Sequence, residues 1–139
     1  LIVEPDRRHA EAIIRDLGCE NAKGVETPAE KRSVEKQLAD HGSPLLSKER
    51  ATTYRSSTMR AAYLAQDRGD LQFAVKELAR WMHEPREAHW ARLKRLGRYL
   101  VHKPRVGQEF AAQESSVDLV VYSDSDHAGD AAPESRGLA

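Results

Sequence analysis

Apolar residues recur at helical spacing along most of the first 105 residues, and this periodicity constrains the fold more than any other feature. The segment from Asp70 to Met82 shows it most clearly. Its apolar positions follow the i, i+3, i+4, i+7 pattern of a helix that buries one face: Leu71, Ala74, Val75, Leu78 and Met82. Comparable patterns predict three more helices, over residues 7–18, 47–67 and 86–103. The N-terminal part of the chain is therefore predicted to be mostly helical.

The ends of these segments carry residues that are typical of helix boundaries. Asp6, Ser47 and Asp70 are placed to cap the first three helices along the chain, and Pro85 suits the first turn of the fourth. Residues 19–46 have little periodicity and are interrupted by prolines and a glycine. We interpret that stretch as a connector.

Two short segments near the C-terminus have the composition of β-strands. Residues 108–113 and 117–124 are predicted to pair as a hairpin through the polar turn at residues 114–116. The predicted fold class is therefore α+β, with a mostly helical region over residues 1–105 and the opening of a sheet over residues 106–139.

Composition excludes several classes of protein. The chain has 139 residues, no net charge and one cysteine, Cys19, so an internal disulfide is excluded. It contains no apolar run long enough for a transmembrane helix. Its first residues do not show the basic region followed by an apolar region that is typical of a signal peptide. We expect no membrane partner and an intracellular location, in a cytoplasmic particle or the nucleus.

Charge is distributed unevenly along the chain. Residues 85–105 hold seven Lys and Arg against one acidic residue, whereas residues 106–139 hold seven acidic residues against one Arg. Lys94, Arg95 and Arg98 lie within the basic stretch and are candidates for contacting nucleic-acid phosphates. The alternative is a helix face that is simply solvated.

Three carboxylates follow the apolar run near the C-terminus: Asp124, Asp126 and Asp130. A calcium-binding EF-hand loop is excluded because Ala128 occupies the fifth position, which needs an oxygen ligand, and Ser135 occupies the twelfth, which needs a Glu. A phosphatase-type aspartate nucleophile would need much more chain downstream. A two-metal nuclease site fits a carboxylate fixed at a strand end. The remaining alternative is that these acids only accept hydrogen bonds from turn amides.

The order of short motifs resembles the C-terminal part of the Pol polyprotein of copia-type retrotransposons, where the reverse transcriptase runs into ribonuclease H. The motifs are HAEAIIRDLG (9–18), VETP (25–28), YRS (54–56), YLA (63–65), RGDL (68–71), PREAHW (85–90), RYL (98–100) and YSDSDHAGD (122–130). Together they cover nearly the whole chain.

This resemblance implies roles for particular residues. Asp124 matches the first catalytic carboxylate of ribonuclease H and would bind Mg²⁺ in the complete enzyme, with Asp126 as a second candidate metal ligand. The helical region would support an RNA–DNA hybrid or primer–template, with Lys94, Arg95 and Arg98 at the phosphates. The remainder of the Pol polyprotein is an implied partner.

The sequence departs from the family pattern at three places. Gly69 replaces the usual proline of R-P-D, His127 replaces a tryptophan and is interpreted as a packing substitution, and residues 134–137 preserve only part of a basic Ser/Thr-rich motif. The other acids of the ribonuclease H site are not found in these 139 residues, so we expect the chain alone to be inactive. The alternative function is a non-catalytic, nucleic-acid-binding or scaffolding remnant of a decayed element.

Overall fold

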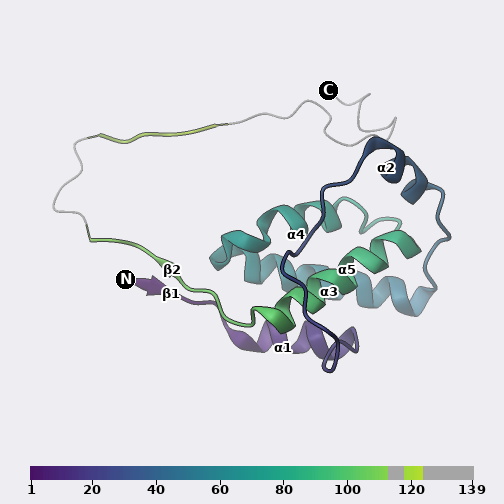
Figure 1. The fold of residues 1–139 in the computed structure, drawn as a ribbon, viewed down its shortest axis with the longest axis horizontal. Coiled ribbons are helices and arrows are strands. Elements are labelled where there is room, and N and C mark those ends of the chain that lie inside the picture. The colour runs from purple at the N-terminus through teal and green to yellow at the C-terminus, as the bar shows by residue number, and fades with distance from the viewer. Residues whose placement is uncertain (113–117, 124–139) are drawn as a thin grey trace.

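Helices dominate the computed structural model, which describes residues 1–112 and 118–123 (Figure 1). The helices are α1 (Arg7–Asp16), α2 (Val34–His41), α3 (Lys48–Asp67), α4 (Gln72–Ala79) and α5 (Glu87–His102), with a 3-10 turn at Gly69–Leu71. Strands β1 (Ile2–Val3) and β2 (Gln108–Glu109) form a small antiparallel sheet. None of the helices in these described ranges has the length and apolar character needed to cross a bilayer.

The predicted boundaries of α1 and α3 are confirmed by their capping contacts. The Asp6 carboxylate accepts a hydrogen bond from the backbone N–H of Arg8 at 2.9 Å. The Ser47 hydroxyl accepts one from the backbone N–H of Arg50 at 3.3 Å. Gly18 ends the first helical segment with a φ of 66°, a left-handed conformation that glycine adopts without steric cost.

Helix α2 lies inside the segment that was predicted to be a connector. Ser33 caps it by accepting a hydrogen bond from the backbone N–H of Lys36, and Gly42 follows its last residue. These two residues are the local signal that the sequence contained. The helix is short and lacks a clear apolar stripe, and so periodicity alone did not reveal it.

Helix α4 begins later than predicted, and Asp70 does not cap it. Asp70 lies in the 3-10 turn, and its carboxylate accepts hydrogen bonds from Arg68 at 2.8 Å and from the Tyr99 hydroxyl at 2.6 Å. Arg68 is fully buried, with 1% of its surface exposed. A buried guanidinium requires a compensating negative charge, and this requirement places Asp70 beside Arg68.

The prediction that α4 and α5 are separate helices is confirmed. Helix α4 ends at Ala79 and α5 begins at Glu87. Pro85 is buried and precedes the N-cap Arg86, so it lies just before the helix and not within its first turn. The carbonyl of Pro85 accepts a hydrogen bond from Leu46, which ties the start of α5 to the segment before α3.

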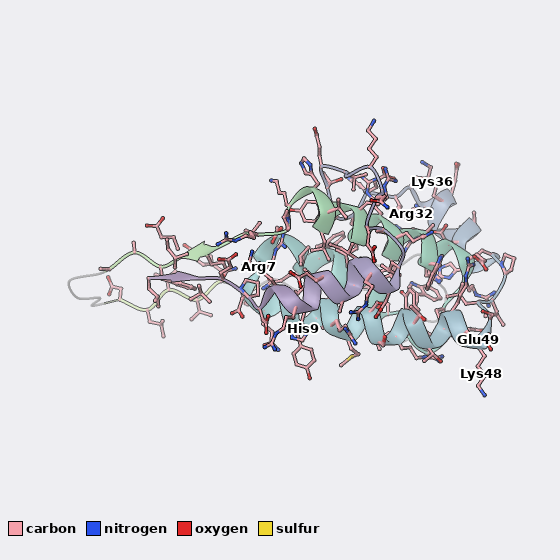
Figure 2. The ribbon with its side chains drawn as sticks, turned by 90° about the horizontal axis from the view of Figure 1, so that it is seen from below. Arg7, His9, Arg32, Lys36, Lys48 and Glu49 are labelled. Carbon is pink, nitrogen blue, oxygen red and sulfur yellow. The ribbon has the colours of Figure 1, made fainter. Side chains whose placement is uncertain are left out.

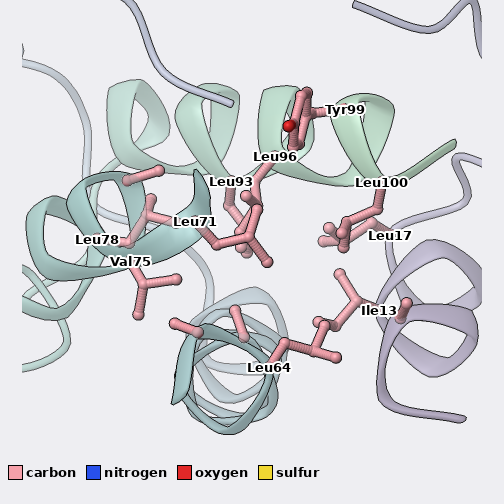
Figure 3. Packing of buried hydrophobic residues seen from close by; sticks show 14 of the residues in the cluster. Ile13, Leu17, Leu64, Leu71, Val75, Leu78, Leu93, Leu96, Tyr99 and Leu100 are labelled. Atoms are coloured by element: carbon pink, nitrogen blue, oxygen red, sulfur yellow. The ribbon is translucent and has the colours of Figure 1, made fainter. Parts of the chain in front are cut away.

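The core fills the space between α1, α3, α4 and α5 (Figure 3). Leucines of α5 project from one side of that helix toward the others, as Figure 3 shows. The fully buried apolar side chains include Ile13, Leu64, Leu71, Leu93, Leu96 and Leu100. The predicted apolar faces of these helices therefore meet in one cluster.

Helix α5 packs closely against the end of the α1 segment at Gly97. A Cβ atom on Gly97 would lie 3.1 Å from Leu17 Cδ1 and 3.2 Å from Cys19 Sγ. Cys19 is a free cysteine that is buried here as a small apolar residue. The absence of a side chain at Gly97 thus lets the two segments approach each other.

The predicted C-terminal hairpin is wrong as far as the described residues show. Strand β2 pairs with the N-terminal strand β1, with Ile2 opposite Glu109 and Val3 opposite Gln108. Residues 118–123 are not in a strand. Hydrogen bonds between Leu1 and Phe110 extend the pairing, so the N-terminal segment supplies the partner that the sequence analysis assigned to residues 117–124. The described fold is mostly helical with one small sheet, which is compatible with α+β.

Candidate nucleic-acid interface

Helix α5 presents the three predicted nucleic-acid-binding residues beside its buried leucines. Lys94 is exposed, whereas Arg95 and Arg98 are half-buried. All three lie within little more than one helical turn and carry positive charge. This arrangement can hold phosphate groups along one helix, because lysine and arginine side chains supply N–H donors and neutralise backbone charge.

Two of these three residues also hold the connector against α5. Arg95 donates to the Thr27 hydroxyl at 2.8 Å and forms an ion pair with Glu30 at 3.0 Å. Arg98 donates from Nε to the backbone carbonyl of Lys23 at 2.8 Å. The sequence does not reveal this structural role, because the connector has no periodic pattern that would place it against a helix.

A second group of charges, which the sequence analysis also missed, joins α2 to α5. Asp40 is buried and accepts hydrogen bonds from two guanidinium groups, those of Arg32 and Arg92. The Arg32 contact measures 2.8 Å. One buried carboxylate is thus shared by two arginines, so the three side chains together carry one positive charge. No motif in the sequence connects these positions.

Aromatic rings lie next to this charge cluster. The rings of Trp81 and His89 stack at a centroid distance of 4.3 Å with an interplanar angle of 13°. The His41 ring lies 4.5 Å from that of Trp81. Trp81 and Trp90 are half-buried and pack against the core. A guanidinium, that of Arg50, lies 5.1 Å above the Trp90 ring.

His89 is buried and held in its neutral form. Its Nδ1 accepts a hydrogen bond from the backbone N–H of Arg86 at 3.0 Å, so Nε2 carries the proton. The pKa of His89 is lowered to about 4, mainly by burial and then by the positive charge of Arg92, with weaker contributions from His41 and Arg86. The carboxylate of Asp40 acts in the opposite direction.

We expect acid to destabilise the fold through His89. Its pKa is about 6.5 in the unfolded chain and about 4 in the folded one, so only the unfolded state gains a proton between these values. This contribution to stability is therefore complete above pH 6.5 and is lost as the pH falls to 4. The expected loss at pH 4 is about 3 kcal/mol, because the two pKa values lie about 2.5 units apart at about 1.4 kcal/mol for each unit and half of the folded His89 is still neutral there.

Urea unfolding between pH 7 and pH 4 measures this effect. His89→Phe keeps an aromatic ring against Trp81 but removes the titrating group, so its stability should depend much less on pH in this range. His83→Gln, at an exposed histidine, is the matched control and should keep the wild-type dependence. Equal pH dependence in wild type and His89→Phe would contradict the assignment.

The predicted metal ligands Asp124 and Asp126 lie outside the described residues. Over residues 1–112 and 118–123, no group of three or more His, Cys, Asp or Glu side chains is arranged to hold a metal ion. The sequence-based assignment of a metal site to Asp124 and Asp126 is therefore still a prediction.

Comparison with known proteins gives the chain a clear set of relatives. It is 36% identical over 124 residues to the retrovirus-related Pol polyprotein from transposon RE2 of Arabidopsis thaliana, which is 89% of this chain and 8% of that protein. It is 42% identical over 79 residues to the corresponding polyprotein from transposon RE1, which is 57% of this chain and 5% of that protein. The chain thus spans less than a tenth of either polyprotein.

A third relative is of another kind. The secreted RxLR effector protein 161 of Plasmopara viticola is 44% identical over 63 residues, which is 45% of this chain and 44% of that protein. No protein-family model matches the chain, and no solved structure matches it. The resemblance to Pol polyproteins inferred from the motifs is confirmed: this chain corresponds to a short segment of a retrotransposon Pol polyprotein.

Proposed function

We propose that the chain is part of a copia-type reverse transcriptase and ribonuclease H, in which its helical region supports an RNA–DNA hybrid or primer–template. The observation that carries this proposal is the similarity to retrotransposon Pol polyproteins along 89% of the chain. In the parent enzyme, RNA is copied into DNA and the RNA strand of the resulting hybrid is cleaved. The rest of the polyprotein is the proposed partner of this segment.

The exposed apolar residues near the C-terminus support the ribonuclease H part of the proposal. Four consecutive side chains are solvent-exposed: Leu119, Val120, Val121 and Tyr122. A contiguous apolar run on a surface is a common sign of a missing packing partner. In a ribonuclease H domain, this run would be a strand covered by other strands and helices of the polyprotein.

Asp124 follows this run and is the proposed metal ligand, with Asp126 beside it in the sequence. Oxygen ligands of this type suit Mg²⁺. When bound, Mg²⁺ would supply the positive charge that favours attack by water on a phosphodiester. The role of this chain would be to contribute the first carboxylate at a strand end.

The hybrid itself would lie on the basic side of α5. Lys94 is exposed there, and Arg95 and Arg98 place two more positive charges next to it. Contacts of this kind are made to phosphates, so we expect binding without sequence preference and with strong salt dependence.

We expect replacement of Lys94, Arg95 and Arg98 together by Gln to weaken binding of an RNA–DNA hybrid. Each phosphate neutralised on a duplex contributes about 0.9 to the slope of log K against log salt concentration, so the slope should fall by about 2–3. Fluorescence anisotropy with a labelled hybrid, measured over a range of salt concentrations, gives this slope directly.

A matched triple variant distinguishes the effect of a local binding surface on affinity from the effect of net charge. Arg7→Gln, Lys36→Gln and Lys48→Gln remove the same charge from exposed positions on other parts of the molecule (Figure 2). This control should keep the wild-type slope. If both triple variants lose affinity equally, or neither does, α5 is not the nucleic-acid surface.

A further inference from the structure

A cavity of about 270 Å³ lies between the connector, α2, α4 and the first half of α5. Residues 28–32 line it from the connector, and Phe73, Leu78 and Trp81 line it from α4 and the turn that follows. Figure 2 shows Arg32, one of its lining residues, on the side of the molecule opposite His9. Neither the motifs nor the proposed hybrid surface accounts for this cavity.

The lining of the cavity carries a net positive charge. It contains six basic side chains, Lys31, Arg32, Lys76, Arg80, Arg92 and Arg95. Three acidic side chains, Glu30, Asp40 and Glu77, also line it. Each of these acids already forms an ion pair with an arginine of the same lining. The six basic and three acidic side chains leave an excess of three positive charges around the cavity. The buried His89 is neutral and does not add to this charge.

Several buried N–H donors on these same residues have no acceptor among the described residues. They are the Nε groups of Arg32, Arg92 and Arg95 and the protonated Nε2 of His89. His89 itself is 1% exposed and lines the cavity. Buried donors are normally hydrogen-bonded, and a group of unpaired donors around one cavity indicates a missing acceptor.

The size and the apolar part of the lining restrict the ligand further. The volume lies just below the range of about 300–1,000 Å³ that is typical of pockets for drug-sized molecules. Phe73 is 62% exposed at this site although it is a large apolar side chain. An aromatic ring in this position can pack against a flat group of a ligand, while arginines hold an anionic group.

We propose that this cavity binds a phosphate monoester that carries a flat ring, such as a nucleotide or the 5′-phosphorylated end of a nucleic-acid strand. The phosphate would accept hydrogen bonds from Arg32, Arg92 and Arg95, and the ring would contact Phe73. A terminal phosphate carries up to two negative charges, which matches the excess of positive charge better than a neutral ligand does. This site shares Arg95 with the basic surface of α5 proposed for the hybrid, whereas Arg32, Arg92 and Phe73 belong to the cavity alone.

Isothermal titration calorimetry with adenosine monophosphate, inorganic phosphate and adenosine tests the proposal. We expect the monophosphate to bind most tightly, phosphate more weakly, and adenosine at least about ten-fold more weakly than the monophosphate, since charge-assisted hydrogen bonds contribute most of the affinity. Oligonucleotides with and without a 5′-phosphate then show whether a strand end also binds, and either source of the monoester satisfies the proposal.

Two variants and one control assign the binding to the cavity. Arg32→Gln should weaken monophosphate binding about ten-fold, while Arg92 still pairs with Asp40 and holds the fold together. Phe73→Ala, at a largely exposed position, should weaken binding of the monophosphate but not of inorganic phosphate. Arg7→Gln, at an exposed arginine outside the cavity, should change neither affinity more than about two-fold.

Circular dichroism of each variant verifies that it is folded. If Arg32→Gln does not fold, the effect of Phe73→Ala on monophosphate binding still tests the proposal. The proposal is overturned if adenosine binds as tightly as its monophosphate, or if Arg7→Gln and Arg32→Gln weaken binding equally. Weaker hybrid binding with unchanged monophosphate binding in the double variant Lys94→Gln and Arg98→Gln would separate this site from the hybrid surface, because Arg95 belongs to both.

Discussion

Replacing Asp70 with Ala should lower the free energy of unfolding by about 3 kcal/mol or more, because it leaves a buried guanidinium without its counter-charge. Arg68 is 1% exposed, and its Nε and Nη2 groups donate to Asp70. The Tyr99 hydroxyl donates to the same carboxylate at 2.6 Å. The substitution therefore breaks contacts that join the turn before α4 to helix α5.

The ionisation of Asp70 agrees with this role. Burial acts to raise its pKa, but the hydrogen bonds from Arg68 and Tyr99 outweigh burial and hold the pKa below its usual value. A carboxyl group whose pKa is lowered by folding stabilises the protein above its unfolded pKa of about 3.8. This contribution is lost as the pH falls through the lower folded pKa, so Asp70 should contribute to unfolding in strong acid.

Chemical denaturation of wild type and variants measures the effect of Asp70→Ala. Asp16→Ala is a suitable control, because Asp16 forms a surface ion pair with Arg15 at 3.3 Å, and such pairs contribute about 1 kcal/mol or less. Tyr99→Phe removes one hydrogen bond and should cost about 1 kcal/mol. A loss for Asp70→Ala no larger than that for Asp16→Ala would show that Arg68 does not depend on this carboxylate.

The sequence predicted most of the helical fold because its signals there are local. The caps at Asp6 and Ser47 act on backbone groups two or three residues away, and an apolar stripe reports which face of a helix is buried. Leu71, Val75 and Leu78 were therefore assigned correctly to a buried face. Periodicity and capping required no knowledge of the partners.

The errors arose where distant residues determine the structure. Asp70 has a side chain typical of a helix cap. Its carboxylate instead accepts hydrogen bonds from a buried arginine and from a tyrosine 29 residues away. Strand β2 pairs with residues more than a hundred positions earlier, and no local pattern specifies that partner. The predicted hairpin paired two segments that are close in the sequence, because no local signal indicates a distant partner strand.

The candidate sites divide in the same way. Lys94, Arg95 and Arg98 could be placed on one helix from the sequence, but the connector contacts of Arg95 and Arg98 could not. The cavity beside Asp40 depends on α2, which the periodicity did not reveal, and on arginines 60 positions apart in the sequence (Arg32 and Arg92). Only the folded chain brings these groups together.

Cleavage of the RNA strand of an RNA–DNA hybrid tests the proposed function most directly. The protein to assay is this segment joined to the remainder of the proposed ribonuclease H domain, since several carboxylates must converge to hold two metal ions. We expect cleavage that depends on Mg²⁺. Asp124→Asn should abolish it, because an amide removes the negative charge that the metal site requires while it keeps the size of the side chain.

Asp118→Asn is the matched control, because Asp118 lies six residues earlier in the same segment and is exposed. It should leave the cleavage rate close to that of wild type. The account predicts Mg²⁺-dependent cleavage in wild type and Asp118→Asn and none in Asp124→Asn. Unchanged cleavage in Asp124→Asn, or no cleavage by the wild-type domain, would contradict it.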